Sequence, residues 1–137
     1  MNIRITWEDN HIIRYDFPEL WSWEDFFKTQ SVTQQLIEKE STHPIGVILN
    51  IPHNIIIPPQ SVANAHQLLQ QIHAVVDVIV VAGGNTVVRA LVNVINRTYW
   101  RDSNRFLHIT DNLEEAREFI AQQHQQNNSS NNDSPKT

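Results

Sequence analysis

Hydrophobic and polar residues alternate at the start of the chain. Ile3, Ile5 and Trp7 are separated by polar residues, and a second alternating segment covers residues 12–17. A period of two is typical of β-strands with one buried face. The polar residues 8–11 between the two segments favour a turn. The chain is therefore predicted to open with a β-hairpin.

A helix is predicted next, because the segment WSWEDFF carries helix-start signals. Ser22 fits the N-cap position, and the Asp25 side chain can accept a hydrogen bond from the Ser22 backbone N–H, as in a capping box. Trp21 and Phe26 have the spacing of a hydrophobic staple, in which the residue before the cap packs against the fourth helical residue. The helix is expected to end at about Lys39, before a proline.

The rest of the chain alternates short apolar segments with longer amphipathic ones. The predicted strands are 45–51, 75–82 and 105–109, and the predicted helices are 61–73, 85–99 and 112–122. Residues 75–82 are almost all Val and Ile, which fits a parallel strand covered on both faces. The order ββαβαβαβα predicts an α/β fold with a mixed, mostly parallel sheet and flanking helices.

Three local features complete this outline. The apolar run 55–57, inside the loop 52–59, could form a brief edge strand or a plug under the sheet. Asp111 is expected to cap the last helix. Residues 123–137 are rich in Gln, Asn and Ser and have little apolar surface to bury, so a disordered tail is predicted after a single domain, 1–122.

Composition restricts the class of protein. The chain has 137 residues, a net charge of −5 and no cysteine. The length suits one domain with its own core, and the negative charge argues against a nucleic-acid partner. The lack of cysteine excludes a disulfide framework and a thiolate zinc site, and it fits a cytoplasmic location. No stretch reaches the roughly 18 apolar residues of a transmembrane segment.

Two adjacent glycines, Gly83 and Gly84, separate the apolar strand from the following helix. Nucleotide-binding proteins also place glycines there, but no P-loop lysine and no third spaced glycine follows. A tight turn with Asn85 as helix cap is one interpretation. The other is an anion site at the helix N-terminus. Its residues would be Gly84, Asn85, Thr86, Arg89 and Arg97.

The helix predicted at 85–99 has an unusually broad apolar surface. One stripe is expected to face the sheet: Val88, Leu91, Val92, Ile95 and Tyr99. Beside this stripe lie Val87, Ala90 and Val94. These three either pack on a neighbouring helix or form a partner or homodimer surface with arginines at its rim.

No acid, base and nucleophile converge in the sequence. His66 and His73 flank one helical face, but metal-binding pairs on a helix favour a spacing of three or four. Acidic residues early in the last helix suit the helix dipole, and no G-x-S-x-G nucleophile motif occurs. We therefore expect a protein that is not an enzyme and holds neither metal nor cofactor.

The element order and three segments, WSWEDFF, GVILNIPHN and VVAGGNTVVRALVNVINRTY, resemble the SpoIIAA-like group of the STAS superfamily. More narrowly, they resemble a subgroup of small bacterial STAS-like proteins. The resemblance covers about residues 3–122. It implies a SpoIIAA-like fold and a non-enzymatic regulatory or binding module that acts through protein–protein contacts.

Two further expectations follow from this resemblance. Antagonists of anti-sigma factors are switched by phosphorylation at the start of the second helix, and the matching residue is Ser61. Here the family motif Asp-Ser-x-Gly-Leu is replaced by PQSVA, so Ser61 is either a phospho-switch or a plain N-cap. Some STAS domains bind nucleotides or lipids. The alternative function is therefore a carrier or sensor of a small apolar or anionic ligand, held between residues 55–59 and the helix start at Gly84.

Overall fold

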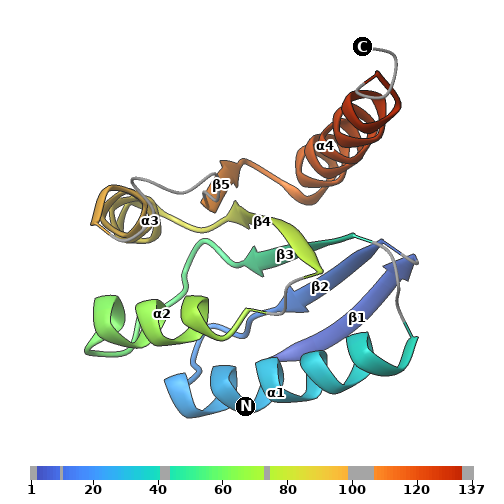
Figure 1. Ribbon diagram of the computed structural model, residues 1–137. Coiled ribbons are helices and arrows are strands. Elements are labelled where there is room, and N and C mark those ends of the chain that lie inside the picture. Colours follow the sequence, from blue (N-terminus) through green and yellow to red (C-terminus); the bar gives the residue numbers. More distant parts are fainter. Residues whose placement is uncertain (1–2, 10, 41–43, 73–74, 99–106, 134–137) are drawn as a thin grey trace.

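The computed structural model describes residues 3–9, 11–40, 44–72, 75–98 and 107–133. Its elements follow the predicted order ββαβαβαβα (Figure 1). The strands are β1 (Arg4–Asp9), β2 (Ile12–Asp16), β3 (Ile45–Ile51), β4 (Val76–Gly83) and β5 (Leu107–Thr110). The helices are α1 (Trp23–Glu40), α2 (Ser61–Gln70), α3 (Thr86–Thr98) and α4 (Leu113–Asp133).

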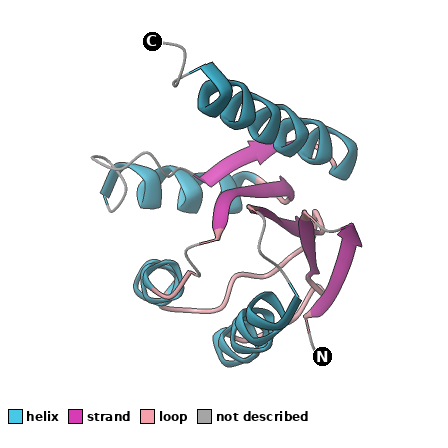
Figure 2. Ribbon diagram, turned by 45° about the vertical axis from the view of Figure 1, so that its right-hand side comes forward, coloured by secondary structure: helices cyan, strands magenta, loops and turns pink. Residues whose placement is uncertain are grey.

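The five strands form one sheet in sequence order, β1-β2-β3-β4-β5. β1 is antiparallel to β2, and all the other neighbours are parallel. Each parallel pair needs a crossover helix, and such crossovers are right-handed. Because successive strands are always added on the same side, α1, α2 and α3 must all cover the same face. α4 follows the last strand, needs no crossover, and lies on the opposite side of the sheet (Figure 2).

Two hydrophobic cores result, one on each face of the sheet. The larger core joins the strands to α1, α2 and α3, with Ile13, Ile37 and Ile45 at most 1% exposed. The smaller core lies under α4 around Ile48 and Ile120. β4 contributes to both: Val76, Ile79 and Val81 belong to the larger, and Val78, Val80 and Ala82 to the smaller. This confirms the prediction of a parallel strand covered on both faces.

The start of α1 forms as predicted. The Asp25 N–H donates to Ser22 Oγ over 3.1 Å, and the Ser22 N–H donates back to Asp25 Oδ2 over 3.2 Å. Trp21 and Phe26 meet edge to face with ring centroids 5.9 Å apart. Both the capping box and the hydrophobic staple are therefore confirmed.

The last helix differs from the prediction at both ends. Its cap is Asn112, whose Oδ1 accepts the Glu115 N–H over 2.9 Å, and not Asp111. At the other end α4 continues to Asp133, so a disordered tail from residue 123 was wrong for 123–133. Glutamine is a good helix former, and a helix already docked on a sheet propagates without a new nucleus. His124, placed in the tail, reaches Asp77 of β4 at 3.0 Å. Residues 134–137 lie outside the described part of the chain.

A charge cluster connects α4 to the first two strands. Glu8 accepts hydrogen bonds from Arg14 of β2 and Arg117 of α4, with closest distances of 2.7 Å to each. Arg14 also bonds Asp16, and the Glu8 side chain is only 10% exposed. The hydrogen bond from Arg117 is the main cause that lowers the pKa of Glu8, and the bond from Arg14 adds to it. The cluster therefore fixes α4 beside β1 and β2.

Replacement of Glu8 by Gln should lower the free energy of unfolding at pH 7 by about 1–3 kcal/mol, because two guanidinium groups lose a charged acceptor. The folded pKa of Glu8 lies below its ordinary value of 4.5, so its contribution is present above that value. It is lost as the pH falls through the folded pKa. Urea unfolding should show the gap between wild type and Glu8→Gln closing in acid.

The matched control is Glu24→Gln. Glu24 pairs with Lys28 at 3.4 Å, but both side chains are more than 70% exposed. Such a pair contributes about 0.5 kcal/mol or less. Equal losses in the two variants would contradict a structural role for the Glu8 cluster.

Candidate functional site

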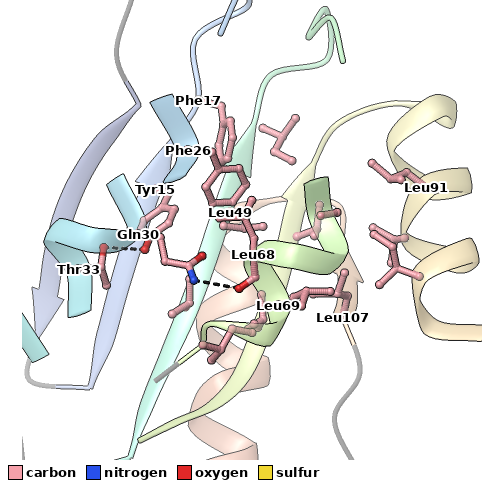
Figure 3. Close-up of a pocket in the computed structure, with 18 of the residues that line it drawn as sticks. Tyr15, Phe17, Phe26, Gln30, Thr33, Leu49, Leu68, Leu69, Leu91 and Leu107 are labelled. Atoms are coloured by element: carbon pink, nitrogen blue, oxygen red, sulfur yellow. Dashed lines mark hydrogen bonds between the residues drawn. The ribbon is translucent and has the colours of Figure 1, made fainter. Parts of the chain in front are cut away.

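An apolar cavity of about 120 Å³ lies between the sheet and helices α1, α2 and α3 (Figure 3). The sheet supplies Leu49 and Leu107 to its wall, α2 supplies Leu68 and Leu69, and α3 supplies Leu91. The gap follows from the shape of α2, which is short, contains one fully buried residue, Leu68, and presents only a methyl group at Ala65. Left empty, a cavity of this volume would cost roughly 3 kcal/mol of stability, at about 24 cal/mol per Å³.

Most polar side chains in the wall have partners within the protein. The Tyr15 hydroxyl donates to Thr33 Oγ1 over 2.6 Å, and the Thr33 hydroxyl donates to the Thr29 carbonyl over 2.9 Å. Gln30 Nε2 donates to the Leu68 carbonyl over 2.9 Å, which joins α1 to α2 (Figure 3). Burial raises the pKa of Tyr15 to about 12. The cavity is therefore a hydrophobic space with a satisfied polar seam along α1.

Aromatic rings close one end of the cavity. Phe17 meets Phe26 and Trp21 edge to face, each with ring centroids 5.1 Å apart. The loop before α2 is fixed against this end, since Trp23 Nε1 donates to the Pro58 carbonyl over 3.3 Å. Ile55, in the same loop, is 5% exposed and joins the larger core. Residues 55–57 thus form no strand, and Ile55 acts as the plug, whereas Ile56 is 54% exposed.

The glycine turn has the turn-and-cap geometry. Gly83 and Gly84 have φ angles of 85° and 83°, a region that side chains disfavour. A Cβ on Gly83 would lie 2.6 Å from the Ile51 carbonyl oxygen. Asn85 Oδ1 accepts the Val88 N–H over 3.2 Å, and its Nδ2 donates to the His53 carbonyl over 2.9 Å. Asn85 is therefore confirmed as the helix cap and also holds the preceding loop.

The predicted anion-binding residues are only partly brought together. Gly84, Asn85 and Thr86 lie at the start of α3, whereas Arg89 pairs with Asp111 at 3.0 Å. Arg97, two turns further along, bonds the Asn93 carbonyl of its own helix over 3.4 Å. The anion site stays a prediction. In the described contacts, Arg89 and Arg97 bind Asp111 and the Asn93 carbonyl and not the start of α3.

The predicted interface and switch residues lie on the surface or near it. Val87 is 61% exposed and Ala90 is exposed, so packing on a neighbouring helix was wrong for these two, while Val94 is half-buried. The cap of α2 is Gln60, in a left-handed conformation with φ 60°, and Ser61 is the first helical residue. Ser61 as N-cap was thus wrong by one position, and phosphorylation of Ser61 stays a prediction.

Nothing in the sequence indicates the cavity, because most of the residues that line it have the pattern of ordinary core residues. In the part of the chain that the structure describes, no three His, Asp or Glu side chains gather to hold a metal ion. Within the same ranges, no helix combines the length and apolar character needed to cross a membrane.

Comparisons with protein-family models, with curated proteins and with solved structures gave no match.

Replacement of Tyr15 by Phe should make stability less sensitive to alkali. The folded pKa of about 12 lies above the ordinary value of 10.0, so Tyr15 favours folding below pH 10. This contribution is lost as the pH rises through the folded pKa. Urea unfolding should show wild type losing up to about 2–3 kcal/mol more than Tyr15→Phe across this window. Parallel curves for the two proteins would mean that the Tyr15 hydroxyl is not buried in solution.

Proposed function

We propose that this protein is a non-enzymatic binding module that carries or senses a small apolar molecule in the cavity between the sheet and α1, α2 and α3. The cavity is the observation that supports this proposal. No charged side chain is among the described residues that line it. An anion would be stripped of water there without a counter-charge, which is very unfavourable. Of the two ligand classes considered from the sequence, the geometry therefore favours the apolar one.

The size of the cavity supports a ligand of about one six-membered ring. An engineered apolar cavity of roughly 150 Å³ stays dry and binds benzene, and the space here is of similar volume, about 120 Å³. An apolar ligand would restore the dispersion contacts that the empty space lacks. It would bind the folded state alone and so stabilise it by mass action.

A larger side chain at Ala65 tests this proposal. Ala65 lines the cavity from α2, so Ala65→Leu should fill it, raise the melting temperature by a few degrees and abolish any further rise caused by benzene. Thermal unfolding with and without benzene measures both effects. Wild type should gain stability from benzene.

Ala63→Leu is the matched control, because Ala63 is exposed on the same helix. It should respond to benzene like wild type. A wild type that is indifferent to benzene, or an Ala65→Leu variant that still responds fully, would rule out the cavity as a binding site.

A second candidate function is contact with a protein partner, as the proposed kinship with STAS domains implies. The observation that favours it is the outer side of α3, where Val87 is 61% exposed with Ala90 beside it. A large aliphatic residue at such exposure is covered at little cost by a second chain. A homodimer through α3 is the simplest arrangement of this kind.

Val87→Glu should convert such a dimer to a folded monomer, seen as a halved mass by light scattering with an unchanged circular dichroism spectrum. Asn93→Glu adds the same charge to another exposed face of α3 and should leave the mass unchanged. A wild type that is monomeric at high concentration would remove the homodimer from consideration.

A further inference from the structure

The edge of the sheet at β5 has backbone groups that point away from the other strands. β5 ends the strand order and lies between α3 and α4 (Figure 1). In a strand, the N–H and C=O groups of alternate residues point to the same side. Leu107 identifies the outer set, because its N–H and C=O are bonded to the side-chain amide of Asn96 over 2.9 and 3.0 Å. Two residues further on, the N–H and C=O of Ile109 must therefore also point away from β4.

An open groove of about 400 Å³ lies along this edge, between β5 and α4. Ile109 lines the groove, although its side chain packs against the larger core on the other face of the sheet. The backbone of Ile109 is therefore the part that reaches the groove. Among the described residues, no hydrogen bond uses the outward N–H or C=O of Ile109. This edge is open to a further strand, which is how many domains bind extended peptides.

The charges of the groove indicate what kind of strand fits beside β5. Asp111, Glu115 and Glu118 line the groove, and no Lys, Arg or His is among the described residues that line it. Arg89 pairs with Asp111 at 3.0 Å. The other two carboxylates are exposed and leave negative charge beside the open edge. Basic side chains complement such a surface.

A second copy of this chain fits the edge poorly. Two β5 strands paired antiparallel about a two-fold axis would place both α4 helices on the same face of the joined sheet. Glu115 and Glu118 of one copy would then lie across the joint from the same residues of the other. Like charges placed opposite each other disfavour association. The occupant is therefore a different chain with the opposite charge.

We propose that the open edge of β5 binds an extended segment of a partner protein as an added strand, with Lys or Arg at alternate positions over α4. The backbone of this segment bonds the N–H and C=O of Ile109, and its basic side chains reach Glu115 and Glu118. The Asn96 side chain, bonded to Leu107, ends the available edge at the start of β5. This surface is separate from the cavity, so the proposal does not rest on the cavity or its ligand.

Three short peptides test the proposal on the full chain. The probe is acetyl-Val-Arg-Val-Arg-Val-amide, which alternates apolar and basic side chains as the added strand requires. In one control peptide glutamate replaces both arginines. In the other, the nitrogen of every residue is methylated, which keeps the charge and removes the backbone N–H groups. Calorimetry should show about tenfold weaker binding, or less, for both controls. The amide proton of Ile109 should move downfield with the probe alone.

Two variants separate the groove from the general negative charge of the protein. Glu118→Gln and Glu114→Gln each remove one exposed carboxylate from α4, but only Glu118 lines the groove. Glu118→Gln should weaken binding of the probe about two- to fivefold, the usual effect of one exposed ion pair, and Glu114→Gln should not change it. Equal effects of the two variants would overturn the proposal. So would tight binding of the methylated peptide, an Ile109 amide that does not respond, or a wild type that binds no peptide.

Discussion

Right-handed crossover connections are the constraint on which the rest of this structure depends. The strands lie in sequence order, so each crossover advances across the sheet in the same direction and places its helix on the same face. α1, α2 and α3 therefore share one face, and among the described elements α4 covers the other. Because the sheet is thus buried on both sides, β4 requires the nearly continuous run of Val and Ile that its sequence contains.

The cavity is a consequence of this shared face. Three helices must cover the larger core, and the middle one, α2, spans only ten residues and carries an alanine where it faces the space. Protein interiors normally reach crystal-like density, so a gap of this size is unusual and weakens the fold unless something occupies it. At one end the cavity is closed by aromatic rings, among them Phe17 and Trp21, and by the loop whose Pro58 carbonyl accepts a hydrogen bond from Trp23.

On the opposite face of the sheet, α4 packs without a second helix beside it among the described elements. Gly46 lacks a side chain where Ile120 of α4 approaches; a Cβ there would lie 2.6 Å from Ile120 Cγ2. The backbone of β3 and the helix are thus in direct contact. Arg117 then reaches Glu8 at the edge of the sheet and gives α4 a polar contact in addition to its apolar ones. Close packing and polar contacts, from Arg117 to Glu8 and from His124 to Asp77, together set the position of the helix.

The sequence by itself determined the elements, their order and most of their ends, because these depend on neighbours a few positions away. The alternation in the hairpin, the reciprocal bonds of Ser22 and Asp25, and the Asn85 cap are of this kind. One-residue errors arose at two helix starts: Asn112 and not Asp111 caps α4, and Gln60 in a left-handed conformation takes the cap position expected for Ser61. Only the tertiary structure decided the cavity and the pairing of Arg89 with Asp111. Volume left between elements, and ion pairs between different elements, exist only after segments distant in sequence have packed together.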